Sequence, residues 1–296
     1  MVDKEGVWLF PIHFKSDIKE DIIIDENKLK LRRMTEEEIH QFFKVKVGER
    51  TEDGLIKSFS GEASDLSTFF ADPLSAPLIN HKLFVCSSQF ILEAKETECV
   101  DWFQQALKLY KNGKTGAFWG VNPKAHSIRF LQPIPFYGRG VYSLEESDIP
   151  KIKELYDTIR NQKGKRYDLL IEKFLFALSG LGIRSENRFL ELATILEMLY
   201  SPKSDRTELS FRFSLRACKV LSKYELMDEK TTYEDMRKIY AIRSSISHSG
   251  FHSEALGFLD KLIDYTRKSL VLFLKDPSIF EDEKLDELCV KNWSRS

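Results

Sequence analysis

The sequence has almost no net charge, no long hydrophobic run and few cysteines, and each absence excludes a class of protein. The 45 Lys and Arg residues are offset by 46 Asp and Glu residues, so no overall positive field attracts nucleic acid or acidic lipid. No segment approaches the roughly 20 apolar residues of a membrane helix, and the N-terminus MVDKEGVWLFPIHF does not resemble a secretory signal. We therefore expect a globular protein of the cytoplasm, with any site for a polyanion confined to part of its surface.

The spacing of the cysteines and the absence of two catalytic motifs exclude further kinds of site. No two cysteines form a Cys-x-x-Cys pair, and all four lie far apart: Cys86, Cys99, Cys218 and Cys289. This spacing predicts reduced thiols, with neither a disulfide framework nor a zinc site. The sequence also contains no Gly-x-Ser-x-Gly elbow and no His-Glu-x-x-His motif. We expect no metal and no cofactor.

The hydrophobic pattern divides the chain near residue 145. Up to about Ser143, short β-branched and aromatic runs alternate with Gly, Pro, Asn and Asp, which predicts a strand-rich α+β domain over 1–145. Two helices are expected within it, one at MTEEEIHQFF with a capping box of Thr35 and Glu38, and one at VDWFQQALKLYKN. The turn-rich run YGRGVYSLEESDIP predicts a boundary between Val141 and Ile149.

The second part of the chain has helical periodicity. It predicts an all-α bundle over 149–276, followed over 277–296 by either a short amphipathic helix or a frayed tail. The first expected helix begins at Ile149. The other five span Leu169–Leu181, Phe189–Tyr200, Leu209–Leu221, Thr232–Ser247 and Glu254–Leu274. The fifth helix opens with capping boxes at Thr231 and Thr232. The predicted fold class is therefore α+β, a mixed strand-rich domain followed by a helical bundle.

Four cations recur on the fourth helix of the bundle. They are Arg212, Arg216, Lys219 and Lys223. Their spacings of four, three and four place them on one helix face. This basic stripe is either an ordinary solvated face or a track for RNA phosphates.

An arginine and a histidine lie five positions apart in the run IYAIRSSISHSG. Arg243 and His248 close the fifth helix, just before Gly250. The spacing alone proves little, because Arg33 and His40 have a similar one. His40 also follows Glu36 by one helical turn, but no third metal ligand is near, so we interpret that pair as a solvated acidic face. A histidine in a last helical turn is favoured by the helix dipole, so Arg243 and His248 are either a helix terminus or an active site.

Three motifs follow one another through the bundle. They are Leu-Glu-x-Leu, then Glu-Leu-x-x-Arg-x-x-x-Arg-Ala, then Tyr-x-x-Arg-Ser-x-x-x-His-x-Gly. Their residues are Leu196, Glu197, Leu199, Glu208, Leu209, Arg212, Arg216, Ala217, Tyr240, Arg243, Ser244, His248 and Gly250. In this order, from about residue 169 to 250, the chain resembles the Apea-like branch of the HEPN domains. The N-terminal half resembles the strand-rich region that accompanies such domains, mainly through LKLRRMTEEE.

The resemblance implies a homodimeric, metal-independent endoribonuclease of a toxin or antiviral-defence type. Arg243 and His248 would be catalytic, with Ser244, Glu208 and Tyr240 in support. Ser244 stands where many members carry Asn, Asp or His. The basic stripe would hold RNA, and the N-terminal domain would have a sensing or regulatory role. An antitoxin or a phage-derived trigger would be a further partner. The alternative is a non-catalytic HEPN scaffold, or a module that binds RNA or a nucleotide.

The residue types suit metal-free RNA cleavage independently of any family. Histidine can remove or supply a proton near neutral pH, and arginine holds phosphate oxygens with a planar fork. Five positions on a helix turn the two side chains about 140° apart. We therefore expect either that the helix bends near Ser247 or that a second copy of the chain completes the site across a two-fold axis.

Overall fold

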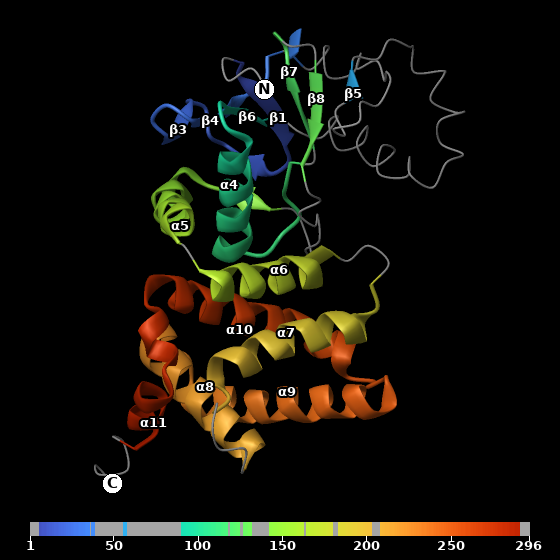
Figure 1. The fold of residues 1–296 in the computed structure, drawn as a ribbon, viewed down its shortest axis with the longest axis vertical. Coiled ribbons are helices and arrows are strands. Elements are labelled where there is room, and N and C mark those ends of the chain that lie inside the picture. Colours follow the sequence, from blue (N-terminus) through green and yellow to red (C-terminus); the bar gives the residue numbers. More distant parts are fainter. Residues whose placement is uncertain are drawn as a thin grey trace. The chain divides into compact units, whose positions relative to one another are not determined.

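The computed structural model has an α+β fold, with an antiparallel sheet in the first part of the chain and helices in the second (Figure 1). It describes residues 6–35, 37–38, 56–57, 90–117, 119–124, 127–131, 142–162, 164–179, 183–202 and 208–290. The chain divides into two compact units, Met1–Tyr156 and Asp157–Ser296. The predicted fold class is confirmed.

The N-terminal unit is built on one seven-stranded sheet. Its strands and helices are β1 (Trp8–Ile12), β2 (Lys15–Ser16), β3 (Ile22–Asp25), β4 (Leu29–Arg33), β5 (Ile56–Lys57), β6 (Phe90–Ala94), α4 (Thr97–Tyr110), β7 (Trp119–Asn122), β8 (Ser127–Phe130), β9 (Ser143–Leu144) and η2 (Glu146–Asp148). The strand order is β3-β4-β6-β1-β7-β8-β5, with every pair antiparallel. A separate parallel pair joins β2 to β9.

The centre of the sheet is apolar because its strands are covered. All five residues of β1 are buried, and so are four of the five in β6. The helix α4 turns its apolar residues inward, with Val100, Phe103 and Leu107 fully buried. Its side chains thus complete the core of this unit.

The capping box expected before the first helix is present. Glu38 donates its backbone N–H to Thr35 Oγ1 at 3.2 Å, and the Glu38 carboxylate accepts from the Thr35 backbone N–H at 2.9 Å. The same carboxylate also pairs with Arg32. The predictions for Glu36 and His40 lie outside the described residues.

Asp101 on α4 gives the N-terminal unit a pH-dependent stability. Its Oδ1 has no hydrogen-bond partner among the described residues, and burial raises the pKa of its carboxyl from 3.8 to about 6. Between those two pH values the folded state keeps a proton that the unfolded state has lost, so stability falls as the pH rises through this window. Replacing Asp101 with asparagine should therefore raise the free energy of unfolding at pH 7 by roughly 2 kcal/mol, and have little effect below about pH 3.5.

Urea unfolding followed by circular dichroism at the two pH values measures this difference. Asp17→Asn is the matched control, because it makes the same change at an exposed carboxylate of the same unit. An equal gain for Asp101→Asn at both pH values would show that the ionised carboxylate is not the cause.

The remaining elements are helices. They are α5 (Ile149–Asn161), α6 (Lys165–Ser179), α7 (Ser185–Tyr200), α8 (Leu209–Glu225), α9 (Glu229–Ser249), α10 (Ala255–Lys275), η3 (Pro277–Phe280) and α11 (Asp282–Val290). The six helices expected from periodicity are all present. For 277–296 the sequence predicted either a short helix or a frayed tail. The described part of this segment contains η3 and the helix α11. Within the described residues, no helix is long and apolar enough to cross a membrane.

Several boundaries differ from the sequence expectation: α6 and α7 each begin four residues earlier, and α8 ends four residues later. The units divide between Tyr156 and Asp157, about two turns into α5, because Lys153 and Tyr156 of this helix donate hydrogen bonds to Ile23 and Asp25. The helix α9 begins at Glu229 and not at Thr232. Its N-cap is Asp228, whose side chain accepts from the Thr231 backbone N–H at 2.8 Å.

The described cysteines carry no disulfide. Cys99 and Cys218 are buried free thiols, and Cys289 is a partly buried one. Cys86 lies outside the described residues.

Candidate functional site

The Arg243 and His248 motif lies at the C-terminal end of α9, where the sequence placed it. The helix runs to Ser249 and ends at Gly250, whose φ of 73° is in the left-handed region that glycine adopts most easily. The Gly250 backbone N–H donates to the Ile246 carbonyl at 2.7 Å. Ser247 Oγ donates to the Arg243 carbonyl at 3.0 Å within the same turn.

Arg243 is tied to the neighbouring helix α7. Its Nη2 lies 3.0 Å from Oε2 of Glu197, and the two side chains are 35% and 20% exposed. Burial raises the pKa of the Glu197 carboxyl, and the guanidinium of Arg243 opposes this rise. Nε of Arg243 is buried without a hydrogen-bond partner among the described residues. Glu197 thus fixes the guanidinium at one nitrogen and leaves other N–H donors for a ligand.

His248 lies on the exposed side of the same helix end. Its ring makes no hydrogen bond or ion pair with the described residues, and it is the basic residue of the last turn of α9. The nearby His252 differs, because its Nδ1 accepts from the Glu254 backbone N–H at 3.2 Å. The ring nitrogens of His248 are therefore accessible from solvent to a bound molecule.

The two side chains of the motif do not meet within one chain. Figure 1 shows α9 as one continuous helix, and its α-helical pattern is unbroken through Ser249. Arg243 and His248 therefore leave the helix about 140° apart and about 7.5 Å apart along its axis. The helix does not bend near Ser247, so the two side chains stay on different faces. Of the two arrangements expected from the sequence, this geometry leaves the one in which a second chain completes the site.

Two of the predicted supporting residues, Ser244 and Glu208, lie on different helices. Ser244 is half-buried and lies one helical turn before His248 on α9. Glu208 is exposed at the start of α8, with φ of 50°. The carboxylate that pairs with Arg243 is Glu197, and Glu208 stays a predicted supporting residue.

The basic stripe on α8 is not the free cationic surface that the sequence suggested. Arg216 is only 1% exposed, so the expectation that it contacts RNA is wrong. Its guanidinium donates to Asp286 Oδ1 at 2.7 and 2.9 Å, to Asp282 at 2.8 Å and to the Tyr200 carbonyl at 3.3 Å. The helix α11 supplies both aspartates and covers this face of α8.

The other cations of the stripe are also engaged. Arg212 Nη2 lies 3.6 Å from Asp286, and Lys219 pairs with Glu229 at the start of α9. The Lys223 ammonium lies 4.8 Å from the centre of the Tyr224 ring. Three of the four predicted phosphate contacts are thus paired with carboxylates, which leaves Lys223 as the member of the stripe without one among the described residues.

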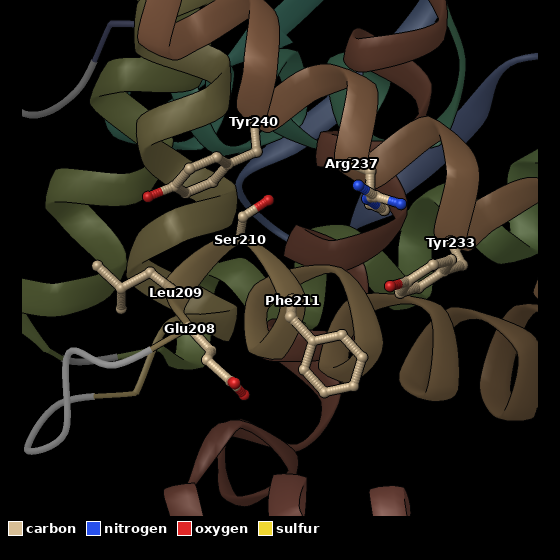
Figure 2. A pocket seen from close by; sticks show the side chains of 7 residues that line it. All are labelled: Glu208, Leu209, Ser210, Phe211, Tyr233, Arg237 and Tyr240. Carbon is tan, nitrogen blue, oxygen red and sulfur yellow. The ribbon is translucent and has the colours of Figure 1, made fainter.

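A groove of about 620 Å³ lies between the start of α8 and the middle of α9 (Figure 2). It is lined by Glu208, Leu209, Ser210, Phe211, Tyr233, Arg237 and Tyr240. The rings of Phe211 and Tyr233 meet edge to face, with centroids 6.5 Å apart. Phe211 is 47% exposed. The groove thus brings aromatic faces and one arginine into contact with solvent.

The sequence analysis missed Phe211, Tyr233 and Arg237. A signal was present on α9, because Tyr233, Arg237, Tyr240, Ser244 and His248 recur at spacings of four, three, four and four. These positions fall within one sector of the helix. The groove and His248 therefore share one face of α9.

No metal centre is evident in the described part of the chain, where no three or more His, Cys, Asp or Glu side chains are placed to hold an ion. No family model, curated protein or solved structure matches the chain.

Proposed function

We propose that this protein is a metal-independent endoribonuclease of the HEPN type, acting in the cytoplasm as a homodimer. The observation that supports it is the Arg243 and His248 pair at an exposed helix end, with the arginine held by Glu197. The order of Glu197, Arg243, His248 and Gly250 agrees with the Apea-like motifs. The N-terminal unit would then regulate cleavage in response to an antitoxin or a phage-derived trigger.

The residues support a complete reaction on RNA. A neutral His248 imidazole accepts the proton of the 2'-hydroxyl, and the 2'-oxygen attacks the adjacent phosphorus. Arg243 stabilises the extra negative charge of the phosphorane. The bond to the 5'-oxygen then breaks, and an imidazolium donates a proton to that oxygen. The products are a 2',3'-cyclic phosphate and a 5'-hydroxyl.

The ends of the products test the proposed reaction. We expect the purified full-length chain to cleave single-stranded RNA in the presence of EDTA. The 5'-hydroxyl ends should accept phosphate from a polynucleotide kinase, and the cyclic phosphates should resist a phosphatase until acid opens them. Cleavage that requires Mg²⁺, or that leaves 5'-phosphate ends, would contradict this mechanism, and so would the absence of cleavage.

A second function is favoured by the ion pair between Arg243 and Glu197. Because this pair joins α9 to α7 within one chain, Arg243 also suits a purely structural role in a non-catalytic scaffold. Under that function Arg243→Ala would loosen the contact between α9 and α7 and lower the thermal stability of the bundle, and there would be no RNA cleavage to lose. A thermal melt and the RNA assay on the same preparation distinguish the two.

A further inference from the structure

Arg237 stands apart from most other described arginines of the bundle. It is exposed and has no ion pair or hydrogen bond with the described residues, whereas Arg216, Arg243 and Arg267 are paired with carboxylates. It also lines the groove, beside the aromatic side chains of Phe211, Tyr233 and Tyr240. The groove therefore contains an arginine that forms no ion pair with a carboxylate of the described residues.

This combination matches the chemistry of an unpaired nucleotide. Single-stranded nucleic acid is held by stacking of bases on aromatic rings and by arginine contacts to phosphate. Figure 2 shows the ring of Phe211 on α8 and the ring of Tyr233 on α9, with Arg237 on the same helix as Tyr233. The exposed part of Phe211 leaves a face on which a base can stack.

The groove is also aligned with the candidate catalytic residue. Arg237 and His248 lie on the same face of α9, eleven residues apart, which is about 16 Å along the helix axis. Tyr240 and Ser244 lie between them on that face. A strand bound in the groove could thus reach His248 by following a single helix.

We propose that this groove is a substrate subsite that holds an unpaired RNA nucleotide away from the cleaved bond, with its base on Phe211 and Tyr233 and its phosphate on Arg237. The subsite rests on the proposed RNA-cleaving function and specifies its substrate as single-stranded RNA. It gives the groove a role that the Arg243 and His248 motif does not supply.

Binding measurements with an uncleaved ligand test the subsite separately from catalysis. The full-length His248→Ala chain is titrated into fluorescein-labelled single-stranded RNA in EDTA, and affinity is followed by fluorescence anisotropy at several salt concentrations. Arg237→Ala should weaken binding about tenfold and lower the slope of log affinity against log salt by about 0.7. Replacing Phe211 or Tyr233 with leucine should also weaken binding about tenfold, and should reduce the preference over duplex RNA of the same sequence.

Lys238→Ala is the matched control. It removes the same charge from the same helix, but Lys238 pairs with Glu254 and does not line the groove. The subsite is overturned if Arg237→Ala and Lys238→Ala lower affinity equally, if neither does, or if the parent chain binds no single-stranded RNA. It is also overturned if Arg237→Ala changes the sedimentation of the protein and leaves RNA affinity unchanged, which would make the groove an interface between copies.

The two proposals fail in different experiments. If Arg237-dependent binding is found but the wild-type chain cleaves no RNA, the groove is an RNA-binding site but not a substrate subsite, and the nuclease proposal fails. If the wild-type chain cleaves RNA but the groove variants bind normally, the nuclease proposal holds and the subsite fails.

Discussion

Replacing His248 with alanine should lower the rate of RNA cleavage by about two to four orders of magnitude, the usual contribution of a general acid or base. The stability of the fold should change little, because the imidazole is exposed and makes no hydrogen bond or ion pair with the described residues. Single-turnover cleavage in EDTA, measured beside a thermal melt, separates these two effects. His252→Ala is the control, since His252 follows the same helix but bonds to the Glu254 backbone. Equal losses for both variants would remove His248 from the mechanism.

The same variant tests whether two chains build each site. The 140° between Arg243 and His248 on an unbroken α9 means that one chain cannot direct both side chains at one phosphate. We therefore expect the arginine and the histidine of a site to come from different protomers. Co-expression of Arg243→Ala and His248→Ala chains with two affinity tags gives a heterodimer with one intact site and one that lacks both groups. That heterodimer should recover about half of the wild-type rate. An inactive heterodimer would contradict the arrangement.

The sequence predicted local features well because they depend on local spacing. The bundle helices follow from the apolar period, and the end of α9 follows from Gly250. The start of α9 was misplaced because Asp228, Thr231 and Thr232 are all suitable caps in the sequence. Only the backbone shows that Asp228, at φ of −62° and ψ of 121°, lies outside the helix.

The contacts of the candidate site could not be predicted from local spacing, because they join residues that are far apart in the sequence. Periodicity placed four cations on one face of α8, but the cover of that face comes from α11, some 70 residues later. The partner of Arg243 is likewise 46 positions away, at Glu197. A complementary pattern was present, since Asp282 and Asp286 have the same four-residue spacing as Arg212 and Arg216. Such a match indicates contact only once the tail is known to be helical.

The buried charge of Arg216 should have the largest effect on stability. Changing both Asp282 and Asp286 to asparagine leaves a guanidinium that is 1% exposed without a counter-charge. Breaking a fully buried pair costs about 3–5 kcal/mol. Because the two aspartates are 31% and 50% exposed, urea unfolding should show a loss near the lower end of that range. Lys238→Ala, which breaks an exposed pair with Glu254, should change stability by less than about 0.5 kcal/mol.

Adding Arg216→Met to the double asparagine variant separates an unpaired charge from lost contacts. Methionine removes the charge and keeps an apolar stem in the space beside Tyr200, so the triple variant should be more stable than the double variant. If the triple variant is less stable, the remaining contacts of Arg216, such as its hydrogen bond to the Tyr200 carbonyl, outweigh the cost of its unpaired charge. Either way, the folded Arg216→Met chain should bind single-stranded RNA as the wild type does, because Arg216 lies beneath α11 and cannot reach a phosphate.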